Sequence, residues 1–207
     1  MNGKKIFRVL IDLLKFSIDI LFPRQCLNCR KMGVKDVLCS DCVPKSVKPQ
    51  KFAEDTYFLY PYNNVYKKII HEYKFNRNKA LADTYLKPLL RQAIYDNYDV
   101  VVLVPSHWMR IFQRGFNHLK RLFNDFNFGD YVYRKKYTPY LYKLDRDSRI
   151  KAIRDSFALK NKEIFYNKNV LIVDDILTSG ATFSELKKLF TEEGNAAKVD
   201  GFFICKS

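Results

Sequence analysis

The apolar residues of this chain follow two kinds of pattern, short continuous runs and stretches with an apolar residue every three or four positions. Residues 99–105 and 170–173 are continuous runs with the length and β-branching of buried parallel strands. The second run leads through a polar loop to a helical pattern at residues 183–193, which Gly194 is placed to end. A final strand is expected at residues 198–205, which end in an apolar run at residues 202–205. Strands connected through helices run parallel, so we predict an α/β protein with a parallel sheet flanked by helices.

The region between residues 50 and 97 adds a strand and two helices to this prediction. Residues 56–62 are typical of a short aromatic strand, and residues 65–75 have the spacing of an amphipathic helix. Residues 79–95 predict a longer helix, interrupted at Pro88. Lys74, Arg77 and Lys79 form a basic cluster at the turn between the two helices.

The first 22 residues are predicted to form an amphipathic helix. Asp12, Lys15 and Asp19 interrupt its apolar stretch, and no small-residue cleavage site follows, so the segment does not fit a secretory signal peptide. No uncharged stretch of the sequence is long enough to span a bilayer. We therefore expect a cytoplasmic protein with no membrane span. Its first helix either docks on its own protein or rests on a membrane surface.

Four of the five cysteines form two Cys-x2-Cys pairs with nine residues between them: Cys26, Cys29, Cys39 and Cys42. In an intracellular chain, four thiolates at this spacing suit a tetrahedral Zn²⁺ site. Because the protein fills all four positions, the metal is expected to stabilise the module rather than to catalyse. Redox disulfides and unrelated cysteines are the alternatives. Cys205 lies in the last apolar run and is expected to be a buried strand residue.

Two prolines indicate where one domain ends and the next begins. Pro44 and Pro49 lie in a Lys-rich stretch and mark a junction near residue 50. We predict an N-terminal helix and four-cysteine zinc module at residues 1–50 and an α/β domain at residues 51–207. The 47% hydrophobic content provides enough apolar material for a sizeable core in the second domain.

The candidate chemistry follows the apolar run at residues 170–173. Asp174 and Asp175 come directly after this run, where the strand is expected to end. The next loop directs N–H groups and hydroxyls toward one point at a helix N-terminus, which suits a phosphate. Two carboxylates beside it suit sugar hydroxyls with Mg²⁺ nearby, so we predict a sugar-phosphate site. An ordinary strand, turn and capped helix is the alternative. The loop residues are Thr178, Ser179, Gly180, Ala181 and Thr182.

This segment resembles the phosphoribosyl diphosphate (PRPP) motif of type I phosphoribosyltransferases: an apolar strand, two acids, two apolar residues, then Thr-Ser/Thr-Gly-x-Thr. The resemblance implies the type I phosphoribosyltransferase fold, with Asp174 and Asp175 on the ribose and residues 178–182 on the 5-phosphate. In that family the loop after the strand at residues 99–105 holds the pyrophosphate through its backbone and a cation. An ordinary surface turn is the alternative. The residues given this role are Ser106, His107, Trp108, Met109 and Arg110.

The charge of the chain points to an anionic partner. Lys and Arg number 37 against 22 Asp and Glu, which gives a net charge of +15, and the basic residues are distributed over many segments. The chain also has 14 Tyr and 17 Phe, which supply rings for stacking bases. A solvated basic surface without a polyanionic partner is the alternative.

Further segments together resemble the ComF family. They include Leu21-Phe22-Pro23 before the cysteines, Ile-His-x-x-Lys-Phe at residues 70–75 and Arg-Gly-Phe-Asn at residues 114–117. His118 stands where the family usually has Gln, and Trp108-Met109 where it often has Pro-Arg. The resemblance covers nearly the full length. It implies a role in natural transformation of bacteria, with single-stranded DNA and other transformation proteins as partners.

Residues 151–157 resemble a mobile loop of the same family that precedes a short strand. Lys151 or Arg154 is expected to close over the pyrophosphate, with a solvated basic turn as the alternative. Two functions remain open. We favour a protein that binds PRPP with Mg²⁺ and handles incoming single-stranded DNA, and the alternative is a phosphoribosyltransferase with an unidentified acceptor. No catalytic residue is identified.

Overall fold

The structure, a computed structural model, describes residues 7, 11, 23–43, 49–81, 86, 97–124, 128–137 and 145–207. The chain divides into two compact units, Met1–Lys45 and Ser46–Ser207, and each is described by itself. Of the helix expected at residues 1–22, only Phe7 and Ile11 are described, and both are helical. Most of the helix expected at residues 79–95 lies outside the described residues, as does Pro44 at the expected junction.

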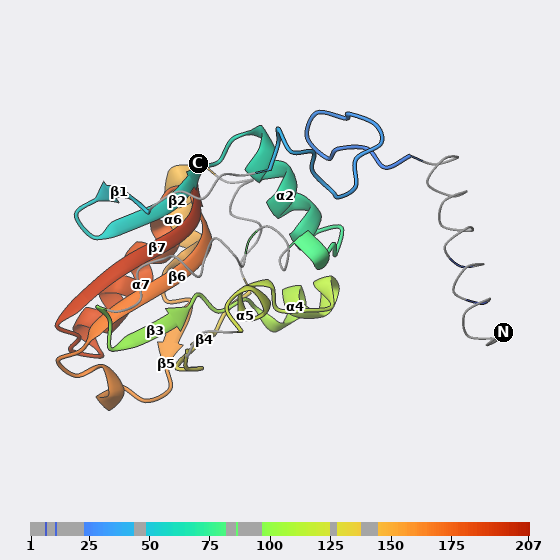
Figure 1. Cartoon of the computed structure of the whole chain (residues 1–207). Helices are drawn as coiled ribbons and strands as arrows, with labels where there is room; N and C mark the ends of the chain where they lie inside the picture. The colour runs from blue at the N-terminus through green and yellow to red at the C-terminus, as the bar shows by residue number, and fades with distance from the viewer. Residues whose placement is uncertain are drawn as a thin grey trace. The chain divides into compact units, whose positions relative to one another are not determined.

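The second unit is organised around a five-stranded sheet with the strand order β1-β2-β7-β6-β3 (Figure 1). Strands β2, β7, β6 and β3 are parallel, and β1 pairs antiparallel with β2 at one edge. This confirms the predicted fold class, a mixed α/β protein with a mostly parallel sheet flanked by helices. The described elements are β1 (Gln50–Ala53), β2 (Thr56–Pro61), α2 (Asn64–Lys74), β3 (Val100–Leu103), α4 (Trp108–Arg114), α5 (His118–Leu122), β4 (Val132–Arg134), α6 (Arg146–Ile153), β5 (Phe157–Leu159), η3 (Glu163–Phe165), β6 (Asn169–Leu177), α7 (Ala181–Glu192) and β7 (Lys198–Lys206).

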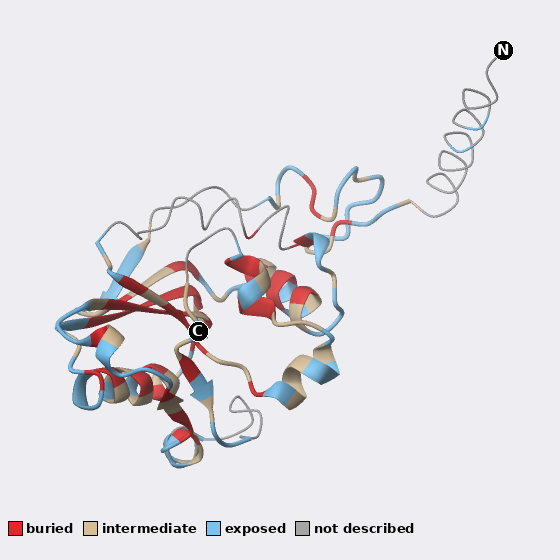
Figure 2. Ribbon diagram, turned by 90° about the horizontal axis from the view of Figure 1, so that it is seen from below, coloured by how far each residue is buried: buried red, intermediate tan, exposed pale blue. Residues whose placement is uncertain are grey.

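The core is formed by the central strands and by the inner face of α7, where buried residues are concentrated in Figure 2. Residues 170–173 of β6 are at most 1% exposed, as expected for a strand buried on both faces. Helix α7 packs on the sheet through Phe183, whose ring lies 6.0 Å from that of Phe203 on β7. Gly201 makes this approach possible, since a Cβ there would lie 2.7 Å from the Phe183 ring.

The two edges of the sheet are short strands. All four residues of β1 are exposed, and its pairing with β2 is irregular between Lys51 and Ala53. The adjacent β2 is more apolar, with Leu59 and Tyr60 buried. At the other edge, β3 contributes four residues to the pairing with β6.

The structure differs from the sequence prediction in two places that concern the site. Strand β6 continues to Leu177 because the long neighbour β7 pairs with it up to Lys206, so Asp174 and Asp175 lie within the strand rather than after it. The pairing of β6 with β3 ends earlier, at Val173. Of the segment expected as a mobile loop, residues 151–153 instead form the last turn of α6, and β5 is the short strand that follows.

Candidate ligand site and four-cysteine cluster

The candidate ligand site lies at the carboxyl ends of β3 and β6, where Figure 1 places α2 and α5 beside the sheet. The N–H of Val104 donates to the carbonyl of Val173 at 2.9 Å, so the chain leaving β3 runs beside the two acids of β6. Successive side chains of a strand point to opposite faces, and Asp174 and Asp175 accordingly have different neighbours. Asp175 is 7% exposed, whereas Asp174 is partly exposed.

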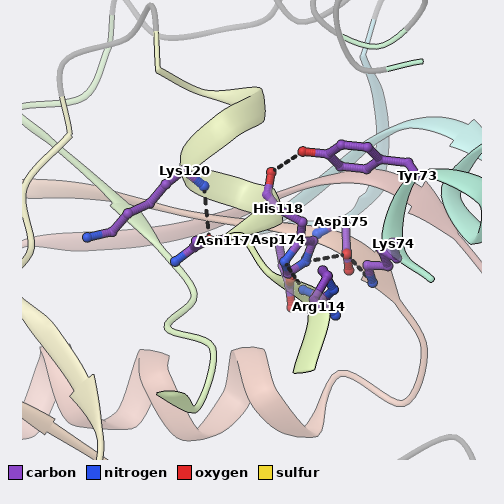
Figure 3. Close-up of polar contacts among 8 residues, drawn as sticks. All are labelled: Tyr73, Lys74, Arg114, Asn117, His118, Lys120, Asp174 and Asp175. Atoms are coloured by element: carbon purple, nitrogen blue, oxygen red, sulfur yellow. Dashed lines mark hydrogen bonds and ion pairs between the residues drawn. The ribbon is translucent and has the colours of Figure 1, made fainter. Parts of the chain in front are cut away.

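Asp175 is held by side chains from two helices (Figure 3). Its Oδ2 atom forms an ion pair with Nζ of Lys74, the last residue of α2. The same oxygen lies 2.8 Å from Nε2 of His118, the first residue of α5. These partners are 101 and 57 residues away along the chain. Asp175 is therefore a buried anchor that joins α2 and α5 to the sheet.

The contacts of His118 define its tautomer. An Arg114 guanidinium nitrogen lies 2.6 Å from Nδ1 of His118, and because guanidinium only donates, Nδ1 accepts this bond. Nε2 then carries the proton and donates it to Asp175. Tyr73 completes the arrangement by donating from its hydroxyl to the His118 carbonyl at 2.7 Å (Figure 3). His118 is thus a neutral, oriented side chain that fixes the Asp175 carboxylate.

The environment shifts the pKa of each of these groups. Burial, helped by the nearby positive charges of Lys74 and Arg114, lowers the pKa of His118 to about 4, although Asp175 opposes the shift. Burial alone would raise the pKa of Asp175, but the Lys74 charge and His118 hold that pKa well below its ordinary value. Burial and the neighbouring Asp175 charge raise the pKa of Asp174 to about 8. Asp175 is therefore the acid that stays ionised, whereas Asp174 binds a proton more readily than an ordinary carboxyl group does.

The loop after β6 has the geometry of a helix-capping turn. Gly180 adopts a left-handed conformation at φ 74° and caps α7. The Ala181 N–H lies 3.5 Å from Oγ of Ser179, which contributes a hydroxyl to the same turn. A helix N-terminus presents N–H groups without intrahelical partners and a positive partial charge. Residues 178–182 consequently form a cradle suited to an anion, directly after the two acids.

Two pockets share this loop. One, of about 940 Å³, combines the loop with Asp175 and with the inner side of α2. The other, of about 640 Å³, combines Thr178, Ser179 and Gly180 with residues of β1 and α7. We consider the first the better candidate because it contains an acid, the loop and aromatic walls together. Its lining residues are Tyr62, Lys67, Ile70, His71, Lys74, Phe75, Asp175, Ile176, Thr178, Ser179 and Ser207.

The segment after β3 forms the beginning of a helix rather than an open loop. His107 caps α4 by accepting from the Met109 N–H at 3.2 Å, and Trp108, Met109 and Arg110 form the first turn. Ser106 and Trp108 line a third pocket of about 260 Å³ together with Arg134. The segment is close to the acids through Val104, but its pyrophosphate role remains a prediction.

Arg134 on β4 is a site residue that the sequence did not single out. Burial, and then repulsion from Arg110, lower the pKa of Arg134 to about 10, and the Asp174 charge partly offsets this. The same two arginines, after burial, lower the pKa of His107. Arg134 therefore lies close enough to Arg110 and to Asp174 for both charges to act on it, and two neighbouring arginines suit a multiply charged anion. They come from separate elements, so no local motif indicates the pairing.

The two residues expected to close over the pyrophosphate lie on α6. Lys151 is an exposed residue in the last turn of this helix, and Arg154 caps its end and is also exposed. Neither lines any of the pockets described above. Their role of closing over the pyrophosphate stays a prediction.

The first unit contains the four-cysteine cluster. The Sγ atoms of Cys26, Cys29, Cys39 and Cys42 lie within 4.8 Å of one another. An antiparallel β-bridge between Gln25 and Met32 folds the chain back on itself. The N–H of Cys26 also donates a hydrogen bond to the carbonyl of Lys31 at 2.9 Å.

Two contacts to sulfur favour thiolates over thiols. The Cys39 N–H points at the Cys26 sulfur at 3.4 Å, and the Asn28 amide points at the Cys42 sulfur at 3.3 Å. Four converging sulfurs with N–H donors around them are the donor set of a structural zinc site. The cluster therefore fits Zn²⁺.

The fold and these two clusters define the class, an α/β protein with a candidate ligand site at the carboxyl ends of a mostly parallel sheet and a four-cysteine cluster. The chain is 26% identical over 172 residues to competence protein F of Haemophilus influenzae, covering 75% of this chain and 73% of that protein. It is 23% identical over 194 residues to competence protein ComFC of Bacillus subtilis, covering 88% and 78%. DNA utilization protein YhgH of Escherichia coli is 26% identical over 153 residues, covering 67% and 66%.

These distant homologues extend over most of the chain and confirm the resemblance to the ComF family. No family model matches the chain. Among the residues that the structure describes, no helix has the length and apolar character needed to cross a membrane.

Proposed function

We propose that this chain is a ComF-like cytoplasmic protein that binds PRPP with Mg²⁺ and handles incoming single-stranded DNA during natural transformation. The observation that carries the PRPP part is the juxtaposition of Asp174 and Asp175 with the capping loop of residues 178–182. Acids accept hydrogen bonds from the ribose hydroxyls, and the loop holds the 5-phosphate. The pocket of about 940 Å³ lined by Asp175 and by Thr178 and Ser179 of the loop is large enough for a sugar phosphate.

The acid pair fits a Mg²⁺–PRPP complex better than it fits PRPP alone. Lys74 and His118 already hold the Asp175 charge, so Asp174 is the carboxylate that gains most from a cation. Mg²⁺ in proteins is bound through one or two carboxylates together with substrate phosphates and water, which matches this donor set. The charges of Arg110 and Asp174 both act on Arg134, and we assign the pyrophosphate to these two arginines.

The DNA part of the proposal rests on charge and on the relatives. A net charge of +15 suits a polyanion, and binding by phosphate neutralisation is sensitive to salt. Two of the relatives are named for competence and one for DNA utilization. Other transformation proteins are proposed as partners on the same grounds.

A second candidate function is catalytic transfer of the phosphoribosyl group. The observation in its favour is the same pocket, because Tyr62, His71 and Phe75 surround the space next to Asp175 and Thr178 with rings that suit an acceptor base. Mg²⁺ would supply neutralising charge for departing pyrophosphate. The chain itself would orient the ribose through the acids and stabilise the pyrophosphate through Arg110 and Arg134.

Calorimetric titration of PRPP with Mg²⁺ into the full chain tests the proposal. Asp174→Asn should weaken binding by about 1 to 3 kcal/mol because charge-assisted bonds are lost. Asp174 is preferable to Asp175 as the test position because Asp175 also holds α2 and α5. Asp147→Asn, an exposed carboxylate in the first turn of α6, serves as the matched control and should bind as the wild type does.

An assay for pyrophosphate release distinguishes the two candidate functions. Pyrophosphate released from PRPP only when a nitrogenous acceptor is added would identify a transferase. Stable PRPP binding without pyrophosphate across a panel of bases and amines would favour a ligand-binding role. Equal PRPP affinity in wild type and Asp174→Asn would remove Asp174 from the ribose site.

A further inference from the structure

Helix α4 exposes two large aromatic rings on one face. Trp108 is 66% exposed and Phe112 is 81% exposed, which places both among the most exposed large hydrophobic residues that the structure describes. Residues four apart on a helix lie one above the other, so the two rings are neighbours. None of the seven residues of α4 is buried, whereas α5 immediately after it buries His118, Leu119 and Leu122. The apolar rings of α4 therefore do not contribute to the core.

The position of α4 is fixed despite this exposure. His107 caps its beginning, and Gly115 ends it in a left-handed conformation at φ 81°. Arg77 donates to the carbonyl of Gln113 at 2.9 Å, which ties the end of the helix to the turn after α2. The two rings are consequently presented from a braced helix next to α5 and α2 (Figure 1).

The surroundings of the rings are basic. Between Asp99 and Asp125 the sequence contains no carboxylate side chain, while it contains Lys120 and Arg121 in addition to Arg110, which is assigned to the pyrophosphate, and Arg114, which bonds His118. Lys120, Arg134 and Lys160 share a pocket of about 260 Å³ with Trp108. Among the described residues that line this pocket the one acid is Asp130, which pairs with Lys120 at 3.3 Å and with Lys160 at 3.0 Å.

We propose that the face of α4 formed by Trp108 and Phe112 binds single-stranded DNA by stacking bases, with the surrounding cations on the phosphates. Exposed rings among lysines and arginines are the combination that single-strand binding proteins use, because every base has a face to stack. The inference rests on the DNA part of the proposed function. The pyrophosphate role of this segment uses its backbone and Arg110, so the Trp108 ring remains available for the DNA.

Trp108 provides a direct readout, since it is the only tryptophan of the chain. The full-length protein is titrated with an oligothymidylate of about 20 nucleotides, a length that exceeds a typical single-strand site. Bases stacked on the indole should quench its fluorescence. An abasic oligonucleotide of equal length carries the same charge without bases and should bind weakly, with no quenching.

Phe112→Ala should weaken oligothymidylate binding roughly tenfold, in line with the loss of one stacked base. The slope of affinity against salt should stay the same, because the ring neutralises no phosphate. Phe112→Leu keeps an apolar side chain without an aromatic face and should bind as weakly as Phe112→Ala. Tyr166→Ala is the matched control, as Tyr166 is 70% exposed but lies beside Glu163 and Glu193. Circular dichroism confirms that each variant is folded.

Several results would overturn the inference. If wild type binds the oligonucleotide without quenching Trp108 and Phe112→Ala binds it equally, the face is wrong although the proposed function stands. If wild type binds no single-stranded DNA, both this inference and the DNA part of the proposed function are wrong. If Phe112→Leu restores full affinity, or the abasic strand quenches equally, stacking is excluded. A blue shift of Trp108 with phosphatidylglycerol vesicles but no response to the oligonucleotide would assign the face to a lipid surface.

Discussion

The two clusters of the chain are assembled in opposite ways. The four cysteines lie within 17 consecutive residues, from Cys26 to Cys42, and two short turns bring their sulfurs together. The ligand site joins Lys74, His118 and Asp175, which are brought together only by the parallel sheet and the helices at its end. The first cluster is a local structure that a metal can stabilise, and the second depends on the whole of the larger unit. Substitutions in the cysteine cluster should therefore cost bound metal, whereas substitutions in the candidate ligand site should cost stability of the larger unit.

The largest effect is expected in the cysteine cluster. Cys26→Ser removes one of four thiolates, and because metal binding and folding are coupled in such modules, the first unit should lose zinc and its fixed structure. Metal analysis per chain and hydrogen exchange of residues 23–43 would measure this. Cys205→Ala is the control and should keep the wild-type metal content, because Cys205 is buried in β7. Unchanged zinc in Cys26→Ser would refute the four-cysteine assignment.

In the ligand site, removal of Lys74 should cost stability rather than a metal. Lys74→Met leaves the Asp175 charge buried with His118 as its remaining partner, and loss of one member of a buried pair destabilises by about 3 to 5 kcal/mol. Urea denaturation of the full chain would measure the change.

The matched variant for Lys74→Met is Lys67→Met, an exposed lysine on the same helix. It should change the free energy of unfolding by less than about 0.5 kcal/mol. Equal effects of the two variants would mean that the Asp175 ion pair does not anchor α2.

The smallest expected effect is a loss of folding stability at low pH that depends on His118. The pKa of His118 is lowered to about 4, below the ordinary value of 6.5, so the unfolded chain takes up a proton in this range that the folded chain does not. The contribution of His118 is therefore intact above pH 6.5 and is lost as the pH falls toward 4, by roughly 2 to 3 kcal/mol.

His118→Gln removes this titration while its amide still donates to Asp175. Its free energy of unfolding should therefore fall less than that of wild type between pH 6.5 and 4. Denaturation curves at four pH values compare the two slopes. Parallel curves would show that His118 is not held neutral in the fold.

The contrast between a cluster formed by nearby residues and one formed by distant residues also explains which features the sequence could predict. The fold class, the strand at residues 170–173, the helix after it and the cysteine cluster follow from local periodicity and spacing. Lys74 was visible as part of a basic cluster, and His118 as a departure from the family pattern, but nothing local pairs either residue with Asp175. Strand β6 extends beyond its apolar run because β7 pairs with it, and α6 forms where a loop was expected. Such features depend on tertiary partners, which a one-dimensional pattern does not contain.

Strand β1 occupies the edge of the sheet next to β2. A parallel sheet that ended at β2 would present open N–H and C=O groups next to Leu59 and Tyr60, a template for edge-to-edge association. The four residues of β1 occupy that edge instead. All four are exposed, one of them is Lys51, and their pairing with β2 is irregular. A short, charged and irregular strand is a poor template for a further strand. By pairing with β2, strand β1 therefore makes this edge of the sheet less suited to edge-to-edge association.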